Sequence, residues 1–317
     1  PDLLAARARP KNGKRIAAIG AGPASLSLAG HLALAGCSVT LFDKKAIPGG
    51  LSVVGIAPYK LHAADALQEI DFIKSLGDVE IRCGIEIVCG DTLPSSSQVS
   101  ATSLLDTFDA VFVGVGLGRD SALQVEGEQG PGVYGATALI ERIKSDETFS
   151  LQGVHKAIVV GAGNTAIDIA RELKMLGVGD VTMVYRRTEK HMKGYVHEMD
   201  AAKRQCVRLL ERRQVARVLR ENGAVVGVAV AHTQDGKPTV GDVDILPCDL
   251  VVVAIGQIGA GSPWTFLGGV EVDRDGRVIV DSATCRTGNP KIYAGGDCVN
   301  GGKEVVDAVQ HGKLAAR

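Results

Sequence analysis

The stretch Gly20-Ala21-Gly22-Pro23-Ala24-Ser25 decides the fold because of what stands on either side of it. It follows an apolar run at residues 14–19, which predicts a buried parallel strand, and it opens a Leu- and Ala-rich segment at residues 23–35, which predicts a helix. In such a strand, turn and helix, the glycines approach a pyrophosphate and the helix N-terminus stabilises its charge. We therefore expect a dinucleotide site here.

The next predicted strand supplies the acid that such a site needs. Residues 38–42, Ser-Val-Thr-Leu-Phe, predict a strand that ends at Asp43. Asp43 lies about 20 residues beyond Gly20, which is the spacing of the carboxylate that binds a ribose hydroxyl. Ser25 stands where a third glycine is common and is small enough for helix and strand to pack closely. The alternative interpretation is an ordinary tight turn.

A second fingerprint, Gly161-Ala162-Gly163-Asn164-Thr165-Ala166, repeats this layout with one difference. The strand that follows its helix, at residues 181–185, ends in Arg186-Arg187 instead of an acid. Guanidinium groups bind a 2′-phosphate that a carboxylate would repel, so the pair favours NADPH over NADH. A solvated pair of surface arginines is the alternative.

Composition and cysteine spacing exclude several classes. The chain has 317 residues, enough for two domains, and its net charge of −1 gives no reason to expect nucleic acid or an anionic membrane. No apolar run is long enough to span a membrane. None of the seven cysteines forms a C-x-x-C pair, which argues against disulfide reductase chemistry and against an iron–sulfur cluster held by this sequence. We expect a cytoplasmic protein with reduced thiols.

A third signature follows a strand near the C-terminus, Tyr293-Ala294-Gly295-Gly296-Asp297, and a predicted helix at residues 303–316 comes next. An Asp in this position can bind a ribityl hydroxyl, and a helix N-terminus can stabilise negative charge on a reduced flavin. This segment would complete the first site as a flavin site. The alternative is an exposed Asp in a turn.

The order of the motifs predicts an α/β fold with two Rossmann-like dinucleotide-binding domains, the NADPH domain inserted into the FAD domain. We expect the FAD-binding domain to comprise residues 1–120 and 260–317, and the NADPH-binding domain residues 121–259. Within the inserted domain, Asn222-Gly223 and Asp235-Gly236 predict hairpin turns. The apolar spacing of Met199, Ala202, Cys206 and Leu209 predicts one helix.

Together these motifs resemble the flavoprotein family that contains the glutamate synthase small (beta) subunit and the electron-input half of dihydropyrimidine dehydrogenase. Blocks at residues 48–51, 58–61, 185–187 and 254–257, with Glu198, extend the resemblance over nearly the whole chain. It implies that NADPH reduces FAD and that electrons pass to iron–sulfur clusters outside this sequence and to a larger catalytic partner subunit. Pro1-Asp2-Leu3-Leu4 resembles the end of the family's N-terminal iron–sulfur domain.

The motifs and the resemblance give one set of expected cofactor-binding residues. For the FAD site they are Gly20, Gly22, Pro23, Ala24, Asp43, Gly50, Leu51, Lys60, Gly116, Gly296, Asp297 and Val305. For the NADPH site they are Gly161, Gly163, Asn164, Thr165, Arg186, Arg187 and Gly256. We nominate no catalytic acid or base, because hydride transfer between two cofactors depends mainly on distance and orientation.

Several alternatives stay open. The chain is an NADPH-oxidising module of the glutamate synthase type, an NAD(P)H-oxidising subunit of a dihydropyrimidine dehydrogenase, or a flavin-binding structural or regulatory subunit with an idle nicotinamide site. We expect no metal site, since nothing in the sequence completes His191, His197 and Glu198 as ligands. The basic stretch at residues 203–220 either receives an acidic partner or is a solvated face. The loop Met192-Lys193-Gly194-Tyr195 lacks the Pro that commonly follows this Met in the family.

Overall fold

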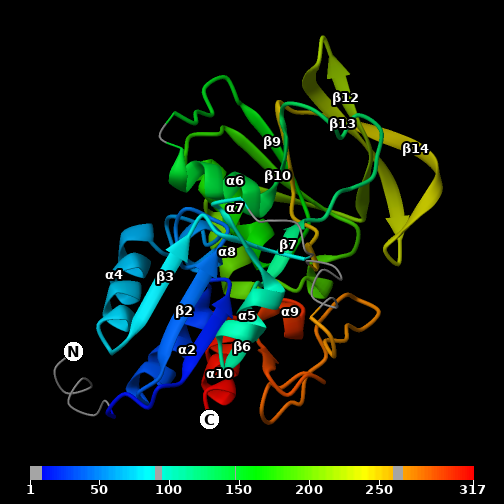
Figure 1. The fold of residues 1–317 in the computed structure, drawn as a ribbon. Coiled ribbons are helices and arrows are strands. Elements are labelled where there is room, and N and C mark those ends of the chain that lie inside the picture. The colour runs from blue at the N-terminus through cyan, green and yellow to red at the C-terminus, as the bar shows by residue number, and fades with distance from the viewer. Residues whose placement is uncertain (1–8, 90–94, 147, 260–266) are drawn as a thin grey trace. The chain divides into compact units, whose positions relative to one another are not determined.

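The computed structural model describes residues 9–89, 95–146, 148–259 and 267–317, so the stretch Pro1-Asp2-Leu3-Leu4 lies outside the described residues. The chain divides into two compact units, which we treat separately (Figure 1). The first unit comprises Pro1–Val53, Leu61–Gly118 and Ile258–Arg317, and the second comprises Val54–Lys60 and Arg119–Gln257. The second unit thus includes a short segment that interrupts the first unit after residue 53.

The first unit is built on a five-stranded sheet in the order β17-β6-β1-β2-β3, and all of its pairings are parallel. Its strands are β1 (Arg15–Ile19), β2 (Ser38–Asp43), β3 (Val79–Cys83), β6 (Ala110–Val113) and β17 (Ile292–Ala294). Its helices are α2 (Pro23–Leu34), α3 (Leu51–Val54), α4 (Ala63–Lys74), α5 (Ala101–Thr107), α9 (Asp297–Asn300) and α10 (Val305–Ala315). A small parallel pair, β4 (Glu86–Val88) and β5 (Gln98–Ser100), completes it. Figure 1 shows β1, β2 and β3 side by side.

The sheet of the second unit has the order β8-β15-β9-β10-β11, again with parallel pairings only, and its strands β15-β9-β10-β11 correspond to β6-β1-β2-β3 of the first unit. The outer strand differs, because β8 comes first in its sheet along the chain whereas β17 comes last. Its strands are β8 (Val133–Gly135), β9 (Lys156–Val160), β10 (Asp180–Tyr185), β11 (Val207–Glu211) and β15 (Leu250–Val253). Its helices are α6 (Ala136–Ser145), α7 (Asn164–Met175), α8 (Val196–Arg204) and the 3-10 helix η1 (Glu189–His191). In each sheet the strand before the glycine fingerprint is central, with the next strand in sequence beside it.

A three-stranded antiparallel sheet follows β11: β12 (Arg213–Glu221), β13 (Ala224–Gln234) and β14 (Lys237–Pro247). Its two turns are the predicted Asn222-Gly223 and Asp235-Gly236. All four residues have positive φ, between 50° and 83°, which is the conformation that this turn type needs and that Asn, Asp and Gly tolerate best. Two further strands, β7 (Leu117–Asp120) and β16 (Gln257–Gly259), pair with each other.

The core of each unit explains why the fingerprint strands read as continuous apolar runs. Residues 17–19 of β1 and residues 157–160 of β9 are buried. In the second unit, helices α6, α7 and α8 cover one face of the sheet, over Ala157 and Val159, and strands β12 and β13 cover the other, over Ile158 and Val160. A strand that is covered on both faces reads as a continuous apolar run. Helix α2 is buried on more than one side, since it packs against β2, α4 and α10.

One expected helix was wrong in its extent. Helix α8 ends at Arg204, Cys206 adopts a left-handed conformation with φ of 62°, and Leu209 lies in β11. The apolar spacing was misleading because Val207, Arg208 and Leu209 also alternate between apolar and polar as a strand does, and pairing with β10 favours the strand.

Candidate functional site

The first glycine turn leaves its helix N-terminus without a side-chain cap. Gly20 has φ of 89°, and a Cβ there would lie 2.6 Å from the Gly114 carbonyl oxygen, so only glycine fits. At Gly22 a Cβ would point into open space, with its nearest neighbour at 4.0 Å. Gly22 is the N-cap of α2, no described side chain caps that helix, and its first turn carries Pro23 but no acid. The uncapped N–H groups and the space beside Gly22 fit an anionic pyrophosphate.

Asp43, at the end of β2, is fixed beside this turn. Its Oδ2 accepts a hydrogen bond from the Ala21 N–H at 2.8 Å, and its Oδ1 accepts one from the Lys45 N–H at 2.9 Å. A carboxylate oxygen has a second lone pair, so both oxygens keep acceptor capacity for a ribose hydroxyl. The Gly49 N–H also donates to the Ala21 carbonyl at 2.8 Å.

Two further expected flavin residues of the first unit, Gly50 and Gly296, lie beside the same turn. A Cβ on Gly50 would lie 3.1 Å from the Cα of Gly22, and a Cβ on Gly296 would lie 3.2 Å from the Cβ of Ala24. Leu51 opens α3, Val305 opens α10, and both are partly exposed. Gly116 has φ of 67° and open space around it. The structure therefore brings Gly50 and Gly296, which are far apart in sequence, to the Gly20-to-Ala24 turn, whereas the flavin contacts of Gly116 and Val305 stay predictions.

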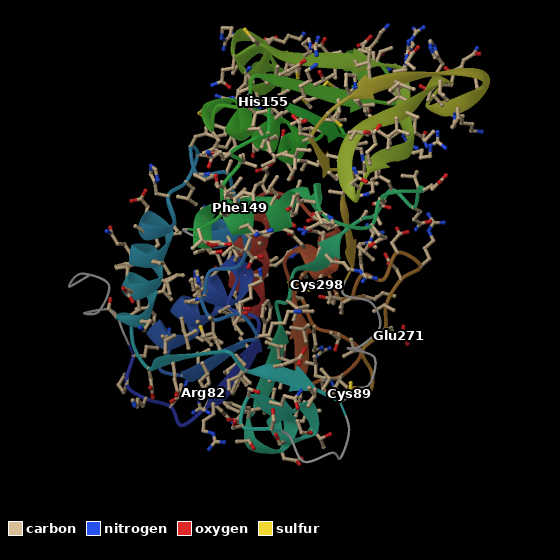
Figure 2. The ribbon with its side chains drawn as sticks, turned by 90° about the horizontal axis from the view of Figure 1, so that it is seen from above. Arg82, Cys89, Phe149, His155, Glu271 and Cys298 are labelled. Carbon is tan, nitrogen blue, oxygen red and sulfur yellow. The ribbon has the colours of Figure 1, made fainter. Side chains whose placement is uncertain are left out.

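Asp297 is the first residue of α9, and burial raises the pKa of its carboxyl group above the usual range. The Lys303 N–H donates to its Oδ1 at 3.3 Å. Cys298, labelled in Figure 2, is fully buried beside it, and its thiol donates to the carbonyls of Val113 and Gly295. Burial raises the pKa of this thiol to about 12, so it stays protonated at neutral pH.

The second turn has the same construction. Gly161 has φ of 133° and would place a Cβ on the Ala254 carbonyl oxygen, whereas a Cβ on Gly163 would meet no atom within 4 Å. Gly163 is the uncapped N-cap of α7, whose first turn contains no acid and includes the exposed Thr165. Gly256 also faces open space, with φ of 116°. This turn fits a second pyrophosphate.

Asn164 has a task that sequence reasoning missed. Its Oδ1 accepts a hydrogen bond from the Tyr195 N–H at 2.9 Å, and the Gly194 N–H donates to the Ala162 carbonyl at 3.1 Å. A Cβ on Gly194 would lie 2.5 Å from the Cδ1 of Ile167, so the loop at residues 192–195 packs directly on the fingerprint. The sequence interpretation concerned the missing Pro at position 193, whereas the contacts of Gly194 and Asn164 hold this loop in place.

Arg186 and Arg187 follow β10, and both side chains are exposed. Their backbone is held in place: the Thr233 hydroxyl donates to the Arg186 carbonyl at 2.6 Å, and the Arg212 N–H donates to the Arg187 carbonyl at 3.0 Å. Within the described part of the chain, neither guanidinium has an acidic partner within ion-pair distance. Both remain available for a phosphate.

The basic stretch at residues 203–220 is mostly neutralised by contacts within the second unit. Four of its side chains pair with acids: Lys203 with Glu189, Arg208 with Asp180, Arg213 with Asp244, and Arg217 with Glu126. Arg220 donates instead to backbone carbonyls. These contacts favour a solvated, ion-paired face over a surface for an acidic partner.

Lys60 lies in a cluster of charges within the second unit, although its expected role was a flavin contact. Its ammonium group lies 2.6 Å from the Asp168 carboxylate and 2.9 Å from that of Glu198. Arg171 binds the second oxygen of Glu198, and its guanidinium lies 4.5 Å from the centre of the Tyr59 ring. The cluster fastens residues 54–60 to α7 and α8. The flavin contact of Lys60 stays a prediction.

Burial and pairing act in opposite directions on the acids of this cluster. Burial raises the pKa of Asp168, and Lys60 and the Tyr59 hydroxyl offset this rise only in part. Burial also acts on Glu198, but hydrogen bonds and charge from Lys60 and Arg171 outweigh it and hold its pKa below the usual range. Burial raises the pKa of the Tyr59 hydroxyl, so it donates to Asp168 throughout the physiological range.

The described residues contain neither a membrane-spanning helix nor a metal-binding group. No described helix combines the length and the apolar character needed to cross a bilayer. Nowhere in residues 9–89, 95–146, 148–259 and 267–317 do three His, Cys, Asp or Glu side chains converge as a metal-binding group. His191 bonds to Thr188, and Glu198 belongs to the Lys60 cluster.

Relatives among curated proteins and solved structures agree with this construction. The glutamate synthase [NADPH] small chain of Escherichia coli is 32% identical over the whole chain, which spans 69% of that protein. The NADP(+)-dependent formate dehydrogenase subunit beta of Moorella thermoacetica is 34% identical over 96% of the chain, which spans only 43% of that protein. The fold is similar to that of T. acidophilum thioredoxin reductase, with a TM-score of 0.75 at 21% identity over 95% of each chain.

A family model gives the assignment directly. The model described as pyridine nucleotide-disulphide oxidoreductase matches residues 14–312. The match confirms the expected fold class, the oxidoreductase activity and the pairing of FAD with NADPH as cofactors. The chain belongs to the pyridine nucleotide-disulphide oxidoreductase family, as this match shows, and its two glycine turns and two parallel sheets agree with the assignment.

Proposed function

We propose that the chain is an electron-input module that oxidises NADPH through FAD and passes the electrons to iron–sulfur clusters and a larger catalytic partner, as the glutamate synthase small chain would. The observation that carries this proposal is the asymmetry between two otherwise equivalent turns. Among the described residues, no side chain caps either helix N-terminus, but one turn is followed by Asp43 and the other by Arg186 and Arg187, which pair with no described acid. The acid suits a ribose, and the two cations suit a 2′-phosphate.

The residues of the first unit would hold FAD. The α2 N-terminus would bind its pyrophosphate, Asp43 its ribose, and Asp297 a hydroxyl of its ribityl chain. Bound FAD would supply the redox chemistry: it accepts a hydride from NADPH and releases electrons one at a time. The chain itself supplies distance, orientation and electrostatics, and neither turn needs a catalytic acid or base.

The residues of the second unit would hold NADPH. The α7 N-terminus would bind the pyrophosphate, and Arg186 and Arg187 would bind the 2′-phosphate. Because Asn164 ties the loop at residues 192–195 to the fingerprint, that loop would keep a fixed position beside the nucleotide.

The clusters and the partner belong to the same proposal. The curated relatives that match are parts of different assemblies by their names, a glutamate synthase and a formate dehydrogenase, at nearly equal identity. Each is longer than the region matched, since the chain spans 69% of the first and 43% of the second. This supports a module that delivers electrons to interchangeable acceptors. A cytoplasmic location stays a prediction.

Rapid mixing tests the proposal. NADPH added to the FAD-loaded chain should bleach the flavin absorbance at about 450 nm, and NADH should do so much more slowly. Arg186→Ala with Arg187→Ala should raise the KM for NADPH about 10- to 100-fold, since each lost charge-assisted hydrogen bond costs about 1.5–3 kcal/mol when fully desolvated and less when exposed. Arg204→Ala, an exposed arginine on α8, is the matched control.

Each outcome separates the alternatives. Bleaching at equal rates with both nucleotides would refute the phosphate role of the arginines. Absence of bleaching in a chain that binds FAD would refute the enzyme and leave the regulatory subunit with an idle nicotinamide site.

A further inference from the structure

A histidine outside every motif contacts the expected flavin-binding segment. The Gly296 N–H donates a hydrogen bond to His311 Nδ1 at 3.0 Å, although the two residues are 15 positions apart. A ring nitrogen that accepts a hydrogen bond carries no proton, so the form of His311 that makes this bond has its N–H on Nε2. His311 lies on α10 and is half-buried.

Close packing places His311 there. A Cβ on the neighbouring Gly312 would lie 2.8 Å from the Leu28 backbone nitrogen, so α10 approaches α2 more closely than any larger residue permits. The Ser27 hydroxyl, on α2, donates to the Val309 carbonyl at 2.9 Å. A Cβ on Gly295 would lie 2.7 Å from the His311 Cβ. The imidazole is thus held against the Gly295-Gly296 backbone from one side.

The bond falls on a backbone conformation that needs support. Gly296 has φ of 77° and ψ of −153°, a region that is open almost only to glycine. Gly296 is buried, so its N–H would be costly to leave unpaired, and it directly precedes Asp297. The bonded N–H belongs to the peptide between Gly295 and Gly296, so the bond supports the backbone on which Asp297 follows.

We propose that His311 is a positioning residue for flavin binding: its Nδ1 holds the Gly296 peptide and thereby presets Asp297 for the ribityl chain. The inference rests on the proposed function, because it takes the first site as the flavin site. His311 itself does not touch the reacting atoms.

Two substitutions of similar size separate positioning from bulk packing. In His311→Asn the amide Oδ1 occupies about the place of Nδ1 and can accept the same bond, whereas His311→Leu puts a methyl group there. Leu is the better helix former, so simple helix stability would favour the variant that lacks the bond. His31→Leu is the control, because His31 Nδ1 bonds to the Ser27 carbonyl of its own helix, which is the local contact that the described residues show for it.

The readouts are the FAD dissociation constant and the hydrogen exchange of the Gly296 amide in the FAD-free chain. His311→Leu should weaken FAD binding about tenfold, equivalent to about 1.4 kcal/mol, and speed Gly296 exchange by at least that factor. His311→Asn and His31→Leu should stay within about threefold of the parent on both measures.

Equal weakening by Leu and Asn at position 311, or no change in either, would overturn the positioning role. If the parent chain itself failed to bind FAD, the proposed function would fall, and with it the role of His311 toward flavin. Gly296 exchange would still report whether the His311 bond exists.

Discussion

Replacement of Lys60 by Met should destabilise the second unit far more than the loss of an ordinary surface lysine. The side chains of Lys60, Asp168 and Glu198 are only 26%, 13% and 15% exposed. Methionine keeps the apolar stem but leaves Asp168 with the Tyr59 hydroxyl as its remaining partner in the cluster. Loss of one partner of a buried pair costs about 3–5 kcal/mol. Because Lys60 is partly exposed and Arg171 still binds Glu198, we expect about 3 kcal/mol.

Hydrogen exchange of the α7 amides at increasing urea measures this loss in the second unit by itself. The control is Lys203→Met, which breaks the exposed Lys203–Glu189 pair of α8 and should cost at most about 1 kcal/mol. Adding Asp168→Asn to Lys60→Met should recover part of the loss, since it removes the uncompensated carboxylate. The reasoning fails if Lys60→Met costs no more than Lys203→Met, or if the double variant is less stable than Lys60→Met alone.

Lowering the pH should reduce the stability difference between Lys60→Met and the parent. The folded-state pKa of Asp168 is already raised by burial, so its ionised form opposes folding above that pKa, and this cost disappears as the pH falls through it. Without Lys60 the cost is larger. The stability gap between Lys60→Met and the parent should therefore narrow as the pH is lowered from neutrality, and a gap that widened would contradict the assignment.

Three further predictions concern the two turns and the flavin segment. Gly163→Ala should keep a stability within about 0.5 kcal/mol of the parent but bind NADPH at least about tenfold more weakly, as a binding titration would show. Gly161→Ala should lose at least about 2 kcal/mol of stability in a urea melt, because Gly161 has a φ of 133°. Asp297→Asn should stabilise the FAD-free chain by about 1 kcal/mol at neutral pH, an advantage that shrinks as the pH falls because burial raises the carboxyl pKa, and should weaken FAD binding. In the folded chain Cys298 should resist iodoacetamide while the exposed Cys206 reacts, as peptide mass mapping would show.

A specific result would contradict each of the predictions for Gly163, Asp297 and Cys298. NADPH binding to Gly163→Ala with parent affinity would place the pyrophosphate elsewhere. Greater stability of Asp297→Asn at low pH than at neutral pH, relative to the parent, would contradict the raised pKa. Rapid alkylation of Cys298 would show that α9 opens readily.

Sequence alone predicted most of the fold, because its decisive signals are local. Strand, glycine turn and helix are contiguous at Gly20 and at Gly161, and Asn222-Gly223 and Asp235-Gly236 specify their hairpins by backbone conformation. The end of α8 was missed because helix and strand periods overlap there, and the competing strand is stabilised by its pairing with β10.

The contacts that sequence could not predict join positions distant in the chain. Lys60 meets Asp168 and Glu198, Asn164 meets Tyr195, and His311 meets Gly296. Each depends on how elements pack in three dimensions, and the residue types alone do not select these partners. A signal was present for Asn164, since the glycine at position 194 marks a close backbone approach.

The placement of β17 beside β6 bears on how the chain is made. Residues 292–294 form the last strand of a sheet whose other members are encoded before residue 114, and α10 must still settle on α2. During synthesis the nascent chain would carry an incomplete first sheet, with one flank of β6 unpaired, while the stretch from residue 119 to residue 257 emerges and folds. A chain that ends before residue 292 would thus have an unpaired, aggregation-prone edge at β6.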